Sequence, residues 1–427
     1  MHVLLVADGR SPTTRGWIRA LLSFGCQVTL VSTYPCAPVE GVEASVCLPV
    51  AFASLAGGSV SASGGGDKTA VNTAGQPAGN AKAAGQGANR ALARRFRGLF
   101  LAGRYRFGPL TLPFYSSRFR WLAERLQPDL IHALRIPFEG MLAAAGAPAG
   151  IPLAVSIWGN DLTLHARRSR QMAELTRKTL HRADALLADA ARDVRLARAW
   201  GLDGGKPALV VPGSGGLALE EIRAVSERVR CEGSRFDDLF DPAAPLVVNP
   251  RGFRPGSVRQ DTFFSALPLA LERKPEILFA CAAMAGQPEA ETALDRLRLR
   301  RSVRLLPHMP QEHLWELFAR AQLTISVSQH DGTPNSLLEA MAAGAFSIAG
   351  DIESLREWIT PGVNGLLVEP DKPQALAEAM LLALDNPDLR RRAALASAQI
   401  LEDRAAAPVV REKIKGLYES LVLSQSR

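Results

Sequence analysis

Residues 323–351 read LTISVSQHDGTPNSLLEAMAAGAFSIAGD, and this stretch decides the fold. An apolar, β-prone run leads into the polar turn 328–333, and a helix-like segment over 334–343 ends at Gly344 before a second strand-like run. Proline suits the first turn of a helix, and a glycine just past the end of a helix readily adopts the left-handed cap. The pattern therefore predicts strand, loop, helix and strand, which is the repeating unit of a parallel α/β sheet.

The loop in this unit is predicted to bind a ligand, because the carboxyl edge of a parallel sheet is where ligands bind. The N–H groups that open the helix, on Asn335, Ser336 and Leu337, would face an anion, most plausibly a phosphate. Asp331 and Glu339 bracket the turn, and carboxylates beside a phosphate are unfavourable unless hydroxyl groups donate to them, as a sugar or ribose does. The spacing predicts a nucleotide-sugar site. The alternative is a pair of acids that only complements the helix dipole.

These residues also carry a resemblance to a known family. The run 331–341, with Gly344, Asp351, Asn364, Gly365 and 368–370 after it, resembles the donor-site signature of the retaining glycosyltransferases of family 4. The resemblance implies an α/β fold of the GT-B type, in which two Rossmann-like domains face each other across a cleft. It implies transfer of a sugar from a nucleoside-diphosphate sugar with retention of configuration, in glycan, polysaccharide or glycolipid synthesis. At the position of Asp331 the family usually has glutamate. Aspartate is one methylene shorter, so the reach of this carboxylate and the sugar that it prefers stay open.

The resemblance also implies donor-binding roles in the second domain. Arg251 and Arg259, in a loop after a predicted strand, would hold the diphosphate, with Arg254 as the less favoured substitute for the family's lysine. Asp331 would be a catalytic residue at the sugar hydroxyls, and Glu339 would accept a hydrogen bond from the ribose. Solvated surface arginines are the alternative for the loop. The predicted donor set is Arg251, Arg259, Gly332, Thr333, Pro334, Asn335, Ser336, Leu337 and Glu339.

The chain opens with a predicted strand-helix-strand unit over residues 2–32, whose ligand edge lies at 8–14. Relatives in the similar family often carry a paired-glycine loop here that approaches the acceptor. This chain has Gly-Arg-Ser-Pro-Thr-Thr instead, so we treat Arg10, Ser11 and Thr13 as candidate acceptor contacts. An ordinary helix cap is the alternative.

Two later strands also end in polar groups. One ends at His132, and the other runs into Trp158, Gly159, Asn160 and Asp161. Similar family members often have histidine, near the reactive end of the sugar, where Trp158 stands. In this chain the role of that histidine would fall to Asp161 or His132, or be absent. Asp161 is therefore the second catalytic candidate. His132, Trp158 and Asn160 are candidate acceptor contacts, although a core or supporting role for the histidine is favoured over direct catalysis.

The domain organisation follows from composition. Residues 1–212 are predicted to form an acceptor domain, interrupted by a flexible Gly/Ala/Ser-rich insertion at about 51–89 that cannot bury enough apolar surface to fold. A glycine-rich cluster at 212–216 marks the boundary. Residues 213–404 are predicted to form the donor domain, and the final helix, 405–427, is predicted to pack back on the first domain.

Length and cysteine usage narrow the class of protein. The 427 residues allow two or three domains, and the five cysteines are odd in number with no CxxC pair, which argues against a disulfide framework or zinc site and favours a reducing compartment. The N-terminus reads as a first strand, and no run approaches the roughly 20 apolar residues of a membrane span. We expect a cytoplasmic protein. His308, His313 and His330 lack ligand-like spacing, so we expect no metal site and no cofactor besides the donor substrate.

The net charge is +8, and the basic residues are unevenly placed. Between Arg90 and Arg125 nine arginines, with one acid at Glu124, are interleaved with aromatic residues. Such a segment suits nucleic acid, anionic lipid or a phosphorylated acceptor, and we rank nucleic acid last because no nucleic-acid-binding motif accompanies it. The predicted partners are a nucleotide sugar, a sugar, lipid-linked or other hydroxylated acceptor, and peripheral contact with the inner face of an anionic membrane. A solvated face over buried aromatic residues is the alternative.

Two other functions stay open at this point. The altered first loop, Trp158 and Asp331 are compatible with a non-catalytic nucleotide-sugar-binding or scaffold protein at a membrane surface. An epimerase or phosphorylase on the same architecture would need acids placed for trans elimination or a lysine-held cofactor, and neither signature is evident in the sequence.

Overall fold

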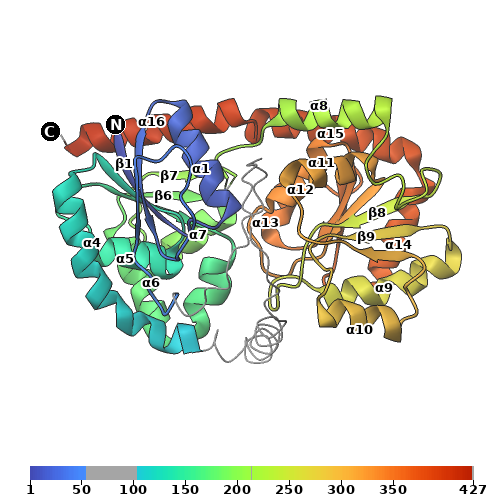
Figure 1. Ribbon diagram of the computed structural model, residues 1–427, viewed down its shortest axis with the longest axis horizontal. Helices are drawn as coiled ribbons and strands as arrows, with labels where there is room; N and C mark the ends of the chain where they lie inside the picture. The colour runs from blue at the N-terminus through green and yellow to red at the C-terminus, as the bar shows by residue number, and fades with distance from the viewer. Residues whose placement is uncertain (54–102, 213, 426–427) are drawn as a thin grey trace, which may run out of the picture.

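The computed structural model describes residues 1–53, 103–212 and 214–425. Two α/β domains, each built on a parallel sheet with helices on both faces, lie side by side along the long axis of the molecule (Figure 1). The strands are short, and the central strands of each sheet are buried, as expected for parallel sheets covered on both faces, while the edge strands are more exposed. The predicted GT-B architecture of two Rossmann-like domains is confirmed.

The first domain contains a seven-stranded parallel sheet with the order β3-β2-β1-β4-β5-β6-β7. Its strands are β1 (His2–Ala7), β2 (Gln27–Ser32), β3 (Ala44–Cys47), β4 (Leu130–Ala133), β5 (Leu153–Ile157), β6 (Ala185–Ala188) and β7 (Ala208–Val210). Its helical segments are α1 (Pro12–Ser23), η1 (Gly108–Thr111), α4 (Leu112–Leu126), η2 (Ile136–Gly140), α5 (Met141–Gly146), η3 (Asp161–His165), η4 (Ala166–Arg168), α6 (Arg170–Arg182) and α7 (Ala191–Ala199).

The second domain contains a six-stranded parallel sheet with the order β10-β9-β8-β11-β12-β13. Its strands are β8 (Leu246–Asn249), β9 (Leu278–Cys281), β10 (Val303–Leu305), β11 (Leu323–Ser326), β12 (Phe346–Gly350) and β13 (Gly365–Val368). The helices are α8 (Leu219–Glu232), α9 (Gln260–Arg273), α10 (Pro288–Arg296), α11 (Gln311–Arg320), α12 (Asn335–Ala342), α13 (Glu353–Arg356), α14 (Pro373–Asp385) and α15 (Pro387–Arg404).

The chain crosses between the domains twice, and the two crossings pair with each other. Leu217 N donates to Ala405 O at 2.8 Å, and Ala407 N donates to Leu217 O at 2.9 Å. The second crossing leads into the C-terminal helix α16 (Ala407–Gln425), which lies along the first domain (Figure 1). Its apolar side chains, including Ile414 and Tyr418, are buried in the core formed by β1, β2 and α1. The last helix therefore ties the two domains together.

The decisive stretch folds as its pattern predicts, with small shifts. The predicted helix at 334–343 is α12, and Pro334 is its N-cap rather than a residue of its first turn. Gly344 has φ +89° and is the predicted left-handed residue after the helix. The prediction missed the strands β3 and β13 and the helices α4, α5, α7, α13 and α15. The insertion predicted at about 51–89 lies outside the described residues apart from its first three positions, as does the part of the arginine-rich segment before residue 103.

Each sheet reverses its strand order at one point, and this positions the site. The reversal lies between β1 and β4 in the first sheet and between β8 and β11 in the second. Ligands of open α/β sheets bind outside the carboxyl ends of the strands at such points. The loops that follow these four strands begin at Asp8, Leu134, Pro250 and Val327.

No helix in the described part of the chain is long and apolar enough to cross a membrane.

Candidate functional site

The centre of the site is an ion pair at the reversal point of the second sheet. Arg251, just after β8, is 6% exposed, and its Nη2 donates to Asp331 Oδ2 at 2.8 Å. Asp331, in the loop after β11, also accepts a hydrogen bond from Ser328 Oγ at 3.0 Å. The backbone of Arg251 is held on both sides, because its N–H donates to Asn249 Oδ1 at 3.0 Å and its carbonyl accepts from Gln260 Nε2 at 2.5 Å. The predicted diphosphate residue and the predicted sugar residue therefore contact each other directly.

The other two arginines of this loop differ in their partners. Arg254 is exposed. The positive charge of Arg251, followed by burial, lowers the pKa of Arg254 to about 10. Arg259 donates through Nη2 to Asp261 at 2.7 Å, so it already has a carboxylate partner. Because Arg254 forms no ion pair with a described residue, it is the freer of the two to meet an anion.

Helix α12 presents its first N–H groups at the same edge. Asn335 and Ser336 are the first two residues of the helix, where backbone N–H groups have no intrahelical acceptor. The prediction was wrong for Leu337, because its N–H donates to Pro334 O at 3.0 Å within the turn. Asn335 Oδ1 is buried and has no hydrogen-bond partner in the described part of the chain. The helix therefore offers two N–H groups rather than three.

Glu339 lies one and a half turns further into α12 and is 6% exposed. It accepts a hydrogen bond from Gln311 Nε2 at 2.7 Å, and burial raises the pKa of its carboxyl group. Its predicted contact with ribose stays a prediction.

The loop that carries Asp331 also forms the contact between the domains. Gly332 has no side chain, and this allows the two domains to approach closely. An added Cβ would lie only 2.8 Å from Asp189 Oδ2 and 2.9 Å from Gly159 N, both in the first domain. Thr333 is 5% exposed, and its hydroxyl donates to Asp189 O at 2.6 Å and accepts from Trp358 Nε1. Gly332 and Thr333, which were predicted to bind the donor, therefore contact the first domain directly.

Asn160 makes a second link between the domains. Its Nδ2 donates to Ser257 Oγ at 2.6 Å in the arginine loop, while its buried Oδ1 has no partner among the described residues. Ser257 Oγ in turn donates to His330 O at 3.0 Å. Asn160, predicted to contact the acceptor, thus reaches the donor loops directly.

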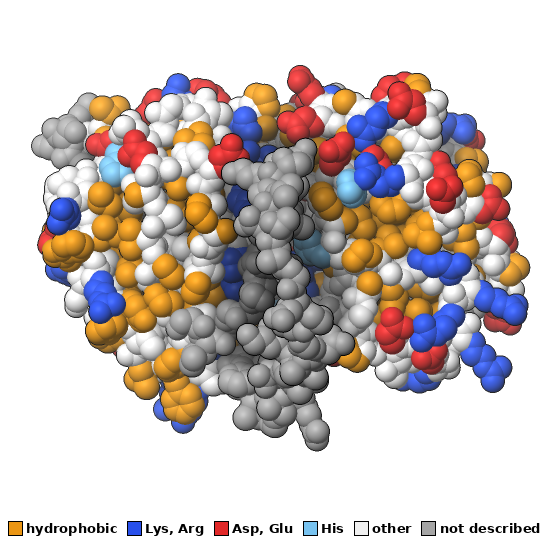
Figure 2. Space-filling model, viewed as in Figure 1, with side chains coloured by type: hydrophobic (Ala, Val, Ile, Leu, Met, Phe, Trp, Pro, Cys, Tyr) orange, Lys and Arg blue, Asp and Glu red, His pale blue; other side chains and the backbone are white. Residues whose placement is uncertain are grey.

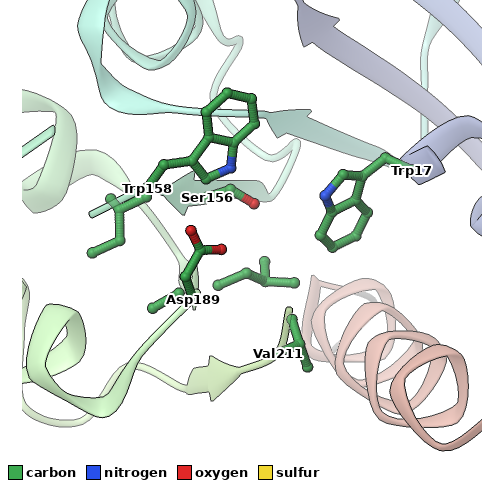
Figure 3. A pocket seen from close by; sticks show the side chains of 8 residues that line it. Trp17, Ser156, Trp158, Asp189 and Val211 are labelled. Carbon is green, nitrogen blue, oxygen red and sulfur yellow. The ribbon is translucent and has the colours of Figure 1, made fainter. Parts of the chain in front are cut away.

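Asp189, which the sequence analysis missed, lies at this contact. Figure 3 shows its carboxylate pointing toward Ser156 between Trp158 and Trp17, in a space too narrow for a water molecule. Burial, together with the nearby acids Asp193 and Asp331, raises the pKa of Asp189 well above its usual value. Asp189 directly follows β6, and the carboxyl end of a strand is the position at which a pattern search could have found it.

Asp161 is fully buried and receives three hydrogen bonds. Arg135 Nη2 donates to it at 2.9 Å, Ile136 N at 3.1 Å and Trp158 N at 3.3 Å. The guanidinium of Arg135 also lies over the Trp158 ring, 5.3 Å from its centroid. In this arrangement Asp161 orients its neighbours, and its predicted catalytic role stays a prediction. Arg135 was not among the predicted site residues, although it follows β4 closely.

The remaining predicted acceptor residues divide into buried and accessible ones. His132 is fully buried, hydrogen-bonded to Ser156 Oγ at 2.8 Å and to Tyr418 OH at 2.5 Å, and burial lowers its pKa to about 3. It is a neutral core histidine that fixes α16 to β4 and β5, which matches the supporting role favoured from the sequence. Ser11 and Thr13 lie partly exposed where α1 begins, beside the first sheet's reversal point.

The boundary between the domains gathers unpaired polar atoms. Burying a polar atom without a partner is costly, so a group of such atoms indicates a site completed by a ligand. Lys and Arg side chains are also visible along the boundary between the two halves (Figure 2). Within the described ranges, six buried atoms near this boundary have no hydrogen-bond partner: Arg135 Nε, Trp158 Nε1, Asn160 Oδ1, His165 Nδ1, Arg251 Nε and Asn335 Oδ1.

Within residues 1–53, 103–212 and 214–425, no three His, Cys, Asp or Glu side chains are grouped so that they could hold a metal ion.

Comparison with known proteins assigns both halves of the chain. Residues 8–213 match the model of the glycosyl transferase 4-like domain, and residues 257–399 match the model of glycosyl transferases group 1. The D-inositol 3-phosphate glycosyltransferase of Streptomyces scabiei is 26% identical over 295 residues, which is 66% of this chain and 61% of that protein. The GDP-mannose:cellobiosyl-diphosphopolyprenol alpha-mannosyltransferase of Xanthomonas oryzae pv. oryzae is 31% identical over 137 residues, 30% of this chain and 36% of that protein. These matches span less than two thirds of each relative.

A solved structure shares the whole architecture. The crystal structure of HepE from Anabaena in complex with UDP-glucose aligns with a TM-score of 0.68 and 16% identity, over 98% of this chain and all of that one. At this identity the likeness concerns the fold. The chain therefore has the GT-B fold, and its two halves match, in chain order, the glycosyl transferase 4-like domain and the glycosyl transferases of group 1.

Proposed function

We propose that the protein transfers a sugar from a nucleoside-diphosphate sugar to a hydroxylated acceptor, with retention of configuration. The observation that carries the proposal is the buried pair Arg251–Asp331 at the reversal point of the second sheet. The guanidinium group of an arginine binds phosphate well, and a carboxylate accepts hydrogen bonds from sugar hydroxyls. The pair therefore offers one group for the diphosphate and one for the sugar of a nucleotide sugar.

The second domain would hold the donor through its charged edge. Arg251 and Arg254 would bind the diphosphate, with Arg259 and the N–H groups of Asn335 and Ser336 assisting. Positive charge fixed at the departing diphosphate stabilises the transition state, because it is already in place where negative charge develops.

The sugar would occupy the space between Asp331 and the first domain. The acceptor oxygen would form its bond to the anomeric carbon on the face that the diphosphate leaves, and the acceptor proton would pass to the departing phosphate oxygen. Asp331 would accept hydrogen bonds from the sugar hydroxyls, and Asp161 would hold Arg135 and Trp158 beside the reacting groups. Glu339 would accept from the ribose.

Two comparisons support this class of donor. The HepE structure contains UDP-glucose, and the Xanthomonas relative is named for GDP-mannose. Because these nucleotides carry different bases, the test needs a panel of donors.

Incubation with UDP-, GDP-, ADP- and dTDP-sugars should reveal one donor that the protein hydrolyses slowly without an acceptor. The Asp331→Asn variant should hydrolyse it about tenfold more slowly or worse, because a charged hydrogen bond to the sugar is lost. Nuclear magnetic resonance of the transfer product should show the donor's anomeric configuration.

The exposed Asp238→Asn variant is the matched control and should keep the wild-type rate. A donor that raises the melting temperature but is never hydrolysed or transferred would instead identify a non-catalytic nucleotide-sugar-binding protein. Inversion in the product would contradict the retaining mechanism.

The outer surface of the first domain supports peripheral contact with an anionic membrane. Phe114 and Trp121, on one face of α4, are 58% and 60% exposed. Arg118 lies over the Phe114 ring and Arg125 over the Trp121 ring, 4.3 and 5.5 Å from the centroids. Aromatic side chains between arginines suit the interface of an anionic bilayer.

The double variant Phe114→Ser/Trp121→Ser should bind vesicles of phosphatidylglycerol and phosphatidylcholine at least about tenfold more weakly than the wild type, because two apolar side chains no longer enter the interface. Co-sedimentation measures the binding. The control Leu395→Ser removes a side chain that is 74% exposed on α15 and should bind as the wild type does. Equal binding by the double variant, or no preference for anionic vesicles, would contradict the proposal.

A further inference from the structure

Helix α7 of the first domain begins against α13 of the second, and Figure 1 shows the two helices on either side of the domain boundary. The N-cap residue of α7, Ala190, has no side-chain oxygen to offer the first N–H groups of the helix. Those of Ala191 and Arg192 donate instead to the two carboxylate oxygens of Glu357, at 2.8 and 2.9 Å. Because Glu357 directly follows α13, the start of α7 is anchored on the second domain.

The side chain of Arg192 is buried at this contact and reaches both domains. Its Nη2 donates to the carbonyl oxygen of Gly159 at 3.2 Å, in the loop after β5. Its Nη1 donates to Ser354 Oγ at 3.3 Å, in α13. Asp193 holds the guanidinium group in place, since its Oδ1 accepts from Nε at 3.1 Å and from Nη2 at 2.6 Å. One guanidinium group thus links a loop of the first domain to a helix of the second.

Ser354 extends this link to Asp331. Its side chain is fully buried, and its hydroxyl donates to the backbone carbonyl of Asp331 at 2.8 Å. A hydroxyl has one proton to donate and lone pairs that accept, so Ser354 can serve Asp331 and Arg192 at once. The carboxylate of Asp331 is held separately, by Arg251 and Ser328. The Arg192–Ser354 bridge therefore fixes the main chain of Asp331 from the first domain, while residues of the second domain fix its side chain.

The charge of Arg192 is already balanced within the protein. Asp193 is its ion-pair partner at 2.6 Å, and both side chains are buried. Burial raises the pKa of Asp193 to about 6, although Arg192 opposes the shift, so the carboxylate is mostly ionised at neutral pH. A buried arginine that has a carboxylate of its own is not free to bind the diphosphate. Its donors hold a backbone carbonyl and a hydroxyl oxygen instead, which keeps the loops in register.

A second ion pair joins the same two helices at the surface and offers a comparison. Arg195, one turn after Arg192 on α7, donates through Nη2 to both carboxylate oxygens of Glu353 at 2.5 and 2.7 Å. Both side chains are more than half exposed, and exposed ion pairs contribute little to stability. Among the described residues, no hydrogen bond joins Arg195 to Ser354 or to Asp331. Arg195 therefore crosses the boundary without reaching the site.

We infer that Arg192 is a positioning residue of the transfer reaction, which acts through Ser354 to hold Asp331 against the loop of Gly159. The inference rests on the proposed function, because Asp331 is the residue proposed to hold the sugar. Groups that act in a transition state must be held to within about 0.5 Å, and a displacement of about 1 Å can cost about 10²-fold in rate. The nucleotide is proposed to bind at Arg251 and the start of α12, and no hydrogen bond of the described residues joins Arg192 to either. The loss is therefore expected in kcat and not in donor binding.

Two variants weaken the bridge in different ways. Arg192→Lys keeps the positive charge beside Asp193 but lacks the planar fork that reaches Gly159 and Ser354 together. It should lower kcat for hydrolysis of the donor found in the panel about ten- to hundredfold, with KM unchanged within about twofold. Ser354→Ala leaves the buried pair Arg192–Asp193 intact and should lower kcat about tenfold, because one buried hydrogen bond to each neighbour is lost. Steady-state kinetics measures both constants, and calorimetry should show unchanged affinity for the donor's nucleoside diphosphate.

The double variant Arg192→Lys/Ser354→Ala shows whether the two residues act together. Because both act through one bridge, its kcat should equal that of Arg192→Lys within about twofold, rather than show the product of the two losses. Arg195→Ala is the matched control and should keep the wild-type kcat. The inference is overturned by losses that multiply in the double variant, by a change in KM alone, by an equal loss in Arg195→Ala, or by wild-type kcat in both single variants.

Hydrogen exchange in the free protein tests the bridge without turnover. The amide hydrogens of residues 329–333 should exchange at least about tenfold faster in Arg192→Lys and Ser354→Ala than in the wild type or Arg195→Ala, because the loop loses one of its anchors. Unchanged exchange in both variants would overturn the inference even where a donor is hydrolysed. Failure of every nucleotide sugar with the wild type, together with exchange that depends on Arg192, would overturn the transfer function and keep Arg192 as the residue that fixes the Asp331 loop.

Discussion

Arg251→Ala should lower the rate of sugar transfer by about 10²- to 10³-fold, the effect of removing a preorganised group that stabilises charge in a transition state. The side chain is 6% exposed. Its Nη2 contacts Asp331, while its buried Nε has no hydrogen-bond partner among the residues that the structure describes. Removing it takes away the contact proposed for the departing diphosphate. It also releases the carboxylate proposed to hold the sugar. Steady-state kinetics with the donor found in the panel measures the effect.

Two comparisons show whether this loss concerns chemistry rather than folding. Arg251→Lys keeps the charge but not the planar fork, so it should recover only part of the rate. Arg301→Ala, an exposed arginine of the same domain, should retain wild-type kinetics. Melting temperatures of all variants should be recorded, because breaking a buried pair can destabilise the fold. A folded Arg251→Ala variant with wild-type kcat/KM would exclude the proposed donor site.

Gly159→Ala should lower transfer about 10²-fold by preventing the contact between the domains. A Cβ at this position would overlap Gly332 N and the carbonyl carbon of Asp331, both of which are backbone atoms that no side-chain rotation can relieve. The loops must then separate, and a displacement of about 1 Å in a catalytic arrangement can cost about 10²-fold. Binding of UDP to the second domain should change little, since the arginine loop is untouched.

Small-angle scattering and calorimetry test this prediction together. The variant should show a larger radius of gyration in the presence of the donor, with UDP affinity close to that of the wild type. Gly204→Ala is the matched control, because a Cβ there meets no atom within 4 Å. Wild-type transfer by Gly159→Ala would show that the contact of Gly159 with the Asp331 loop is not part of the active arrangement.

Much of the donor edge could be predicted from local sequence. Arg251 and Asp331 each follow an apolar strand-like run, and the carboxyl ends of parallel strands lie at one edge. The helix at 335–342 was recognisable from its flanking Pro334 and Gly344. These features depend on residues a few positions apart, so a pattern search can find them.

Other assignments failed or were missed because they depend on distant contacts. The N–H group of Leu337 was expected to be free, but the turn bends far enough for it to reach Pro334 O. Asp189 and Arg135 were not predicted as site residues. Asp189 contacts the loop of Thr333, and Arg135 contacts Asp161 and Trp158, and neither contact is evident from the neighbouring sequence. The core position of His132 depends on Tyr418, which lies in the last helix.

The sequence alone determined the two parallel sheets, the strand ends that carry Arg251 and Asp331, and the helix that follows them. It could do so because alternating apolar runs, prolines and glycines act within one supersecondary unit. Only the tertiary structure decided that Gly159 lies against Gly332, that Asp189 is buried at that contact, and that Arg251 pairs with Asp331. These results depend on how two separately folded domains meet, and that geometry arises from packing between residues far apart in the chain.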